Sequence, residues 1–179
     1  MQYRINAGFI PGAHWHQDIE IGGGRIIGEV CHFIDTMQYV CNADPVSVTA
    51  QALNDGNSSA DPDNVSITIT FSDGSIGTIA YVASGDPAFP KERLEVFGGG
   101  KAGIIDNWRT LLVQGNGRKF KKRCWLQAEK GHAQEMAAFI EGIRKDVSPI
   151  SFESQILTTQ TTFAIQEALR EGGTVQVGA

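Results

Sequence analysis

The sequence has few cysteines, no excess of positive charge and no long apolar run. Its three cysteines, Cys31, Cys41 and Cys124, are an odd number without C-x-x-C spacing, which is typical of reduced thiols and not of a disulfide framework or a zinc knuckle. Fifteen Lys and Arg against twenty Asp and Glu give a net charge of −5, which argues against a dedicated nucleic-acid-binding protein. No stretch of about 18 consecutive apolar residues is present, so we expect no membrane span.

The first residues also lack a signal peptide, because no basic segment precedes an apolar run of the required length. We therefore expect a cytoplasmic protein. No internal repeat or long polar linker divides the sequence, so residues 1–179 are interpreted as one domain.

What the sequence does contain is glycine, 21 of 179 residues, together with a change of hydrophobic period along the chain. Residues 25–41 carry apolar side chains at three- and four-residue spacings, which predicts an amphipathic helix entered from Gly22–Gly24. Period-two segments bounded by turn residues then predict strands over residues 46–52, 65–71, 76–82, 93–97, 103–106, 110–114 and 119–126.

The C-terminal quarter returns to helical spacing. Helices are predicted over His132–Lys145 and Gln155–Glu171, the second capped by Ser151 and ended by Gly172-Gly173. A helix, then hairpin-linked strands, then helices predict an α+β fold: an open, mostly antiparallel sheet with helices packed on one face.

The predicted helix 25–41 has a polar face that is the first candidate site. At 100° per residue Arg25, Glu29, His32 and Thr36 share a sector of about 60°, and Asp35 borders it. An imidazole beside a carboxylate is what proton transfer with a substrate hydroxyl requires. The alternative is a solvated helix face with an ordinary histidine. The preceding glycines favour the first interpretation, since they let a ligand or a second backbone come close.

The loop His14-Trp15-His16-Gln17-Asp18 is dense in aromatic and hydrogen-bonding groups, which suit a polyol or a sugar. The alternative is a surface loop anchored by Trp15. His14-x-His16 with Glu20 also lies close to the first metal motif of cupins. A cupin, however, needs a second histidine motif and a strand where residues 25–41 predict a helix.

Two further motifs have simple interpretations. Gly98-x-Gly100-x-x-Gly103 matches a dinucleotide fingerprint, but the chain continues as a strand instead of opening a helix, so we interpret it as a hairpin loop. The basic run Arg118–Arg123 is interpreted as a solvated face or rim of the sheet. A phosphate-bearing substrate or an acidic partner chain is the alternative.

Longer stretches resemble a known family. NAGFIP-x-x-HW-x-x-D, followed by GGGRIIGEVCHFID, resembles the opening of the second domain of the glucose–fructose oxidoreductase/inositol dehydrogenase (Gfo/Idh/MocA) family. LEVFGGGKAGIIDN, HAQEMAAFIEGI and EALREGGTVQV fit the same domain, so the resemblance covers essentially the whole chain. It implies the substrate-binding half of an NAD(P)-dependent oxidoreductase acting on a sugar or cyclitol hydroxyl.

The resemblance also implies roles for single residues. His32 matches the catalytic histidine, and the position four residues earlier, an aspartate in many members, is Gly28 here. Glu29 is expected to take over the orienting role, since a spacing of three places it on the same helix face as His32. The substrate-facing region of the family is matched by Asn6, Trp15, Asp18 and Arg25.

In that family a Rossmann domain with a Lys-Pro segment binds NAD or NADP and supplies a catalytic lysine. Neither feature is evident here, and a complete two-domain dehydrogenase needs about twice 179 residues. We therefore expect no cofactor bound by this chain, an N-terminal nucleotide-binding domain as partner, association through the sheet into a homodimer or higher oligomer, and no activity of the chain alone. The alternatives are a non-catalytic sugar-binding or dimerisation module with a decayed site, and a cupin-like metalloenzyme.

Overall fold

The computed structural model describes residues 1–53, 63–124, 128 and 130–178, and its centre is one nine-stranded sheet. The strand order is β8-β7-β6-β5-β1-β4-β3-β2-β9, and every neighbouring pair is antiparallel except β1 and β4. The strands are β1 (Gln2–Asn6), β2 (Pro45–Ala52), β3 (Val65–Phe71), β4 (Ile76–Val82), β5 (Glu92–Gly98), β6 (Lys101–Asp106), β7 (Thr110–Gly115), β8 (Arg118–Arg123) and β9 (Thr174–Gln176).

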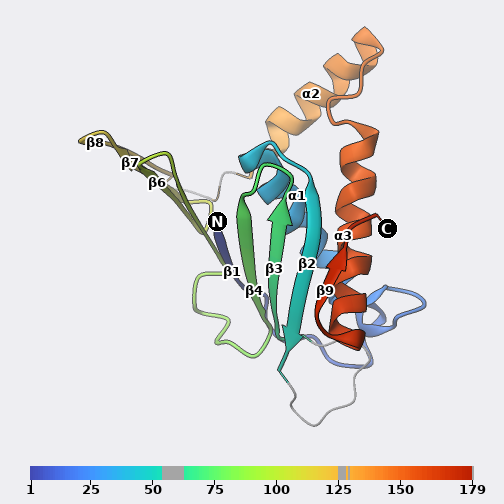
Figure 1. Ribbon diagram of the computed structural model, residues 1–179. Coiled ribbons are helices and arrows are strands. Elements are labelled where there is room, and N and C mark those ends of the chain that lie inside the picture. Colours follow the sequence, from blue (N-terminus) through green and yellow to red (C-terminus); the bar gives the residue numbers. More distant parts are fainter. Residues whose placement is uncertain (54–62, 125–127, 129, 179) are drawn as a thin grey trace.

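The helices cover one face of this sheet (Figure 1). A π helix, η2 (Ile26–Val30), continues directly into α1 (Cys31–Cys41), and both pack beside α3 (Phe152–Glu171). The predicted α+β architecture is therefore confirmed. Strands β6, β7 and β8 extend beyond the part of the sheet that α1 and α3 cover (Figure 1). Helix α2 (His132–Lys145) also projects from this layer and has no buried residue.

The core lies between η2–α1, α3 and the inner face of the sheet. Alternation in β3 shows why: Val65, Ile67, Ile69 and Phe71 are buried against the helices while the residues between them are polar. From the helical side Ile26, Val30, Phe33, Ile34, Met37 and Ile165 fill the same core. The apolar spacing of residues 25–41 thus produces the predicted amphipathic helix.

Threonines of poor helix propensity are buried in α3, where hydrogen bonds satisfy them. Thr158 donates to Gln38 of α1 at 2.6 Å, and Thr161 donates to the Leu157 carbonyl at 2.6 Å. The helix begins three residues before the predicted start, with Ser151 accepting from the Ser154 amide at 3.0 Å as predicted for a cap.

The glycine-rich stretch after β5 is a hairpin, as predicted. Gly99 and Gly100 have φ of 55° and 71° and turn β5 directly into β6, so no helix N-terminus follows that could hold a pyrophosphate. Asn116 and Gly117 have φ of 51° and 71° and form the second two-residue turn, between β7 and β8. The basic run is the exposed edge strand β8, which confirms its interpretation as a rim.

Three elements were missing from the sequence prediction: β1, β9 and the 3₁₀ helix η1 (Trp15–Gln17). Strand β1 is five residues long and β9 only three, too short to establish an alternating pattern. The predicted strand 119–126 ends at Arg123, and its positions 125 and 126 lie outside the described residues. None of the described helices is long and apolar enough to cross a membrane.

Candidate functional site

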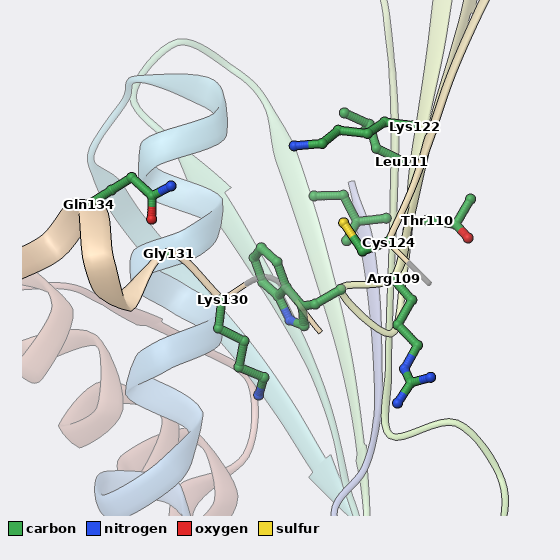
Figure 2. A pocket seen from close by; sticks show the side chains of 10 residues that line it. Arg109, Thr110, Leu111, Lys122, Cys124, Lys130, Gly131 and Gln134 are labelled. Atoms are coloured by element: carbon green, nitrogen blue, oxygen red, sulfur yellow. The ribbon is translucent and has the colours of Figure 1, made fainter. Parts of the chain in front are cut away.

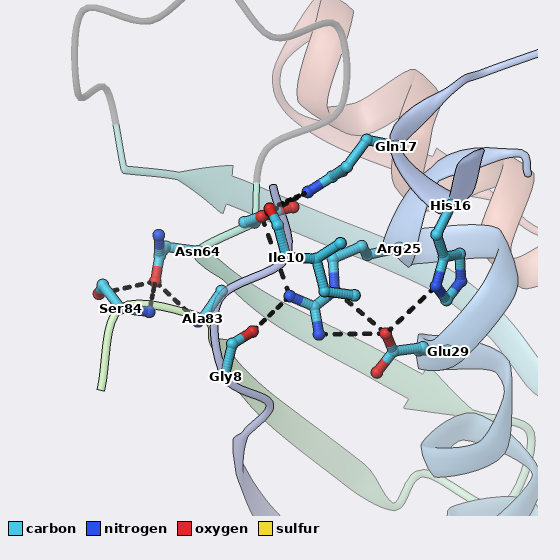
Figure 3. A network of polar contacts seen from close by, with 10 residues as sticks. Gly8, Ile10, His16, Gln17, Arg25, Glu29, Asn64, Ala83 and Ser84 are labelled. Atoms are coloured by element: carbon cyan, nitrogen blue, oxygen red, sulfur yellow. Dashed lines mark hydrogen bonds and ion pairs between the residues drawn. The ribbon is translucent and has the colours of Figure 1, made fainter. Parts of the chain in front are cut away.

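The candidate site lies where the loop after β1 meets the start of η2 (Figure 3). Gly22 lies so close to this loop that a Cβ there would be 2.5 Å from the Trp15 carbonyl oxygen. The predicted close approach at the glycine triplet is therefore made by a second backbone. It fixes the segment carrying Trp15 and His16 against the start of the helix.

Arg25 is the central cation of the site, and it is buried. Its side chain is 1% exposed and its guanidinium lies 5.1 Å from the centroid of the Tyr81 ring. Nε and Nη2 contact Glu29 Oε1 at 3.1 and 3.0 Å, and Nη1 donates to the Gly8 carbonyl at 2.7 Å. Asp63 Oδ2 lies 3.9 Å from Nη1. Arg25 therefore joins the loop, the helix and the sheet.

Glu29 lies between Arg25 and a histidine of the loop (Figure 3). His16 Nδ1 is 3.9 Å from the same oxygen, Oε1, that Arg25 contacts. The Glu29 side chain is 17% exposed, so its carboxylate lies mostly inside the protein. Glu29 therefore links the buried Arg25 to the loop that carries His16.

His32 lies on the exposed side of α1, four residues after Gly28. Its carbonyl accepts from Thr36 Oγ1 at 2.8 Å. Among the residues that the structure describes, no hydrogen bond or ion pair joins His32 to Glu29. The 100° wheel does not apply at the start of this helix, because residues 26–30 form a π turn with i→i+5 bonding. This turn places Arg25 in the interior while His32 faces outward.

The other predicted substrate-facing residues have different surroundings. Asn6 ends β1, is buried, and donates to the Asp86 carbonyl at 2.7 Å. Asp18 accepts from the amides of Glu20 and Ile21 at 2.9 and 3.0 Å and so fixes the turn before the glycines. Trp15 is exposed and stacks on His16, with ring centroids 5.0 Å apart and planes at 14°. Asn6 and Asp18 therefore shape the backbone, whereas Trp15 presents a ring to solvent.

Sequence reasoning missed Asp63 and Tyr81 as members of this site. Gln17 donates to Asp63 Oδ2 at 2.8 Å, and the buried Asp63 Oδ1 has no hydrogen-bond partner in the described structure. Burial raises the pKa of Tyr81, whose ring lies beneath Arg25. Nothing in the sequence signalled either residue, because both reach the site from strands and turns far from the helix.

A second polar cluster was also missed, centred on the buried Glu92 of β5. Its carboxylate accepts from the Tyr3 hydroxyl at 2.9 Å, the Trp108 indole at 2.7 Å and Lys130 Nζ at 3.2 Å. Burial opposes ionisation, but these hydrogen bonds outweigh it and hold the pKa of Glu92 below its ordinary value. Burial and the nearby carboxylate together raise the pKa of Tyr3.

Beside this cluster, a cavity of about 330 Å³ opens between β6–β7 and the start of α2 (Figure 2). Ile105, Trp108 and Leu111 supply apolar walls, and Lys130 and Gln134 lie at its other side. None of the six predicted site residues lines it. The cavity is therefore separate from the site at the start of the helix.

The structure also contradicts the alternative of a cupin-like metalloenzyme. Residues 26–41 are helical and the sheet is open, so the chain does not have the cupin barrel. The His14 and His16 rings have centroids 6.3 Å apart, and His14 Nδ1 accepts from the His16 amide at 3.3 Å. Over residues 1–53, 63–124, 128 and 130–178, no three His, Cys, Asp or Glu side chains are grouped to hold a metal ion.

A known family model matches the part of the chain that contains the candidate site. Residues 1–102 match the model described as the GFO/IDH/MocA C-terminal domain. The chain belongs to the Gfo/Idh/MocA family. The matched segment includes β1, the loop, η2 and α1, which together form the candidate site.

Solved structures of several oxidoreductases share the fold at low identity. An NAD binding oxidoreductase from Klebsiella pneumoniae superposes with a TM-score of 0.80 at 18% identity, over 99% of this chain and 58% of that one. An aldose-aldose oxidoreductase from Caulobacter crescentus superposes with a TM-score of 0.78 at 18% identity, over 98% of this chain and 55% of that one.

A UDP-N-acetylglucosamine 3-dehydrogenase from Acidithiobacillus ferrooxidans gives a TM-score of 0.72 at 18% identity, over 96% of this chain and 53% of that one. The chain thus spans about half the length of the solved structures it matches. No curated protein matches the sequence.

Proposed function

We propose that this chain is the substrate-binding half of an NAD(P)-dependent oxidoreductase that acts on a hydroxyl of a sugar or cyclitol. The observation that carries the proposal is the exposed His32 of α1, which follows Glu29 of the Arg25–Glu29–His16 cluster by three residues on the continuous η2–α1 helix. Family membership supports it, as do related structures named as a dehydrogenase and an oxidoreductase of sugars.

In this proposal His32 takes the hydroxyl proton as the substrate is oxidised and returns it in the reverse direction. Glu29 and Arg25 fix the helix entry, and Trp15 presents an apolar ring to the sugar. Asn6 and Asp18 contribute through the backbone that they hold. Gly98–Gly103 forms a hairpin that does not fit a pyrophosphate, so a separate N-terminal nucleotide-binding domain would hold the NAD or NADP.

The sheet face opposite the helices is the proposed surface for a homodimer or higher oligomer. Helices α1 and α3 lie on one side only (Figure 1), and the other side presents the alternate residues of the strands, such as Thr68 of β3 and Thr78 of β4. We expect the assembly in the cytoplasm, where the thiols of Cys31 and Cys41 stay reduced.

The test is an assay of the chain combined with its cognate nucleotide-binding domain. Formation of NAD(P)H is followed with myo-inositol and D-glucose, and the same measurement is made for His32→Ala. We expect turnover by the complex, none by the chain alone, and a loss of at least about 100-fold in kcat for the variant. Absence of oxidation, together with unchanged binding of both compounds by His32→Ala, contradicts the proposal.

A second candidate is a non-catalytic sugar-binding or dimerisation module. The observation in its favour is that Glu29 is held by Arg25 and makes no hydrogen bond to His32 within the described residues. Calorimetry distinguishes the two functions: binding of myo-inositol or D-glucose that is unaffected by Glu29→Ala and His32→Ala favours the module.

A further inference from the structure

The His16 ring packs on the helix at Gly28, and it can do so only because residue 28 has no side chain; this position of the ring is called its seat below. A Cβ built on Gly28 would lie 2.6 Å from His16 Nε2 and 3.3 Å from its Cδ2. The imidazole therefore packs directly on the backbone of η2. Its side chain is 18% exposed, so the ring is largely enclosed but still reachable from solvent.

Two further contacts hold this ring. Glu29 Oε1 lies 3.9 Å from Nδ1 on one edge, and the Trp15 indole stacks on one face of the imidazole. Arg25 fixes Glu29 in turn through two contacts to the same oxygen, at 3.0 and 3.1 Å. A loop histidine held on its edge, on its face and against a helix is ordered before any ligand arrives, which reduces the entropy cost of binding.

Gly28 and His32 are four residues apart on the continuous η2–α1 helix. His16 therefore packs on the helical segment that leads directly into the one carrying His32. The hydroxyls of a six-membered polyol ring lie on neighbouring carbons, so one ring can present hydroxyl groups to two side chains of the same region. The exposed Trp15 ring stacks on His16 at this point, and Glu29 Oε1 lies beside the same imidazole.

We propose that His16 is a second substrate-contacting imidazole, which binds a hydroxyl of the ring adjacent to the one handled by His32. The inference rests on the proposed function and narrows it. The preferred substrates are cyclic polyols with at least two hydroxyls in reach, while alcohols with one hydroxyl bind through His32 alone. Glu29 acts as a positioning residue for His16.

The chain has only four histidines, so each imidazole can be followed by nuclear magnetic resonance and assigned by single substitutions. The full chain is titrated with myo-inositol and D-glucose, and with 1-propanol as the alcohol with one hydroxyl. We expect the resonances of His16 and His32 to move with the polyols and those of His132, on α2, to stay fixed. If only the His32 resonances move, the role of His16 is contradicted and the proposed function is retained. If neither histidine moves, both fail.

Gly28→Ala supplies a sharper test, because the added methyl group displaces the His16 ring while alanine is well tolerated in a helix. The matched control is Gly12→Ala in the same loop, where a Cβ meets nothing within 4 Å. We expect Gly28→Ala and His16→Ala each to weaken polyol binding by about 3- to 10-fold, the range of one hydrogen bond.

The double variant Gly28→Ala/His16→Ala distinguishes a lost seat from general damage. Because both substitutions remove the same contact, the double variant should bind the polyol no more weakly than His16→Ala alone. Glu29→Gln should move the His16 resonances in the unliganded chain, because the carboxylate oxygen beside Nδ1 is replaced by an amide. Additive losses in the double variant, or polyol binding unchanged in His16→Ala, contradict the inference.

Discussion

Glu92 and Glu29 each lie beside a cation at the edge of the core, but their carboxylates differ in burial and in hydrogen bonding. Both oxygens of Glu92 are satisfied, by Tyr3, Trp108 and Lys130 at 2.9, 2.7 and 3.2 Å. Glu29 contacts Arg25 and His16 through Oε1. The Glu92 cluster joins strand to turn and has the character of a structural element. The Glu29 cluster joins a loop to a helix.

The cations of the two clusters also differ in burial, in the opposite direction to the two carboxylates. Arg25 is almost fully enclosed, whereas the side chain of Lys130 is 45% exposed. In the Glu92 cluster the carboxylate is buried and its cation reaches solvent, while in the Glu29 cluster the cation is buried and the carboxylate reaches solvent. Removing the buried member of each cluster should therefore cost most, because that side chain is the one that contacts all the other members, and each of them then loses its partner.

The largest effect is expected from Arg25→Met. The substitution leaves Glu29 and Asp63 without their cation and removes the contact to the Gly8 carbonyl. We expect a loss of about 3 kcal/mol in the free energy of unfolding, measured by urea denaturation. The matched control is Arg93→Met: Arg93 pairs with Glu95 at 2.8 Å but is 39% exposed, so its loss should cost less than about 1 kcal/mol. Equal losses would remove the distinction between the buried and the exposed pair.

Next comes Glu92→Gln, which keeps the shape of the side chain but removes the charge. Three donors then face a neutral amide, and the charge-assisted bonds weaken. We expect a loss of about 1 to 3 kcal/mol at pH 7 in the same denaturation experiment. A loss within about 0.5 kcal/mol would show that the cluster contributes little to stability.

The acid dependence of stability follows from the same carboxylate. Its pKa is lower in the folded protein than the ordinary value of 4.5, so its stabilisation is complete above that value and is lost as the pH falls through the folded pKa. Wild type should therefore lose stability more steeply than Glu92→Gln below about pH 5. Parallel curves for the two proteins, measured by denaturation from pH 7 to pH 3, would contradict this assignment.

Much of the fold was predictable because its long elements repeat their pattern. The alternation in β3 and the spacing from Ile26 to Cys41 each span enough residues to define a period. The short β1 and β9 do not, and their pairing depends on neighbours distant in sequence, such as β4 with β1.

The candidate site was only partly predictable, for a different reason. Helical spacing placed Arg25, Glu29 and His32 on one face but assumed a regular helix, and the π turn changed which of them is buried. The contact between His16 and Gly28 joins residues twelve apart through a loop whose path no periodicity describes. Such long-range side-chain contacts require the three-dimensional structure.

The smallest effects compare the two tyrosines beside these clusters, Tyr3 and Tyr81. Both are buried, but the Tyr3 hydroxyl donates to Glu92 at 2.9 Å, whereas the Tyr81 hydroxyl has no hydrogen-bond partner in the described part of the chain. Tyr3→Phe should cost about 1 kcal/mol, since it removes one donor to a charged acceptor. Tyr81→Phe should be neutral or stabilising by up to about 1 kcal/mol, because it relieves a buried polar atom of its desolvation cost. Urea denaturation of the two variants beside wild type measures the difference, and equal losses would mean that the two clusters satisfy their buried groups to the same extent.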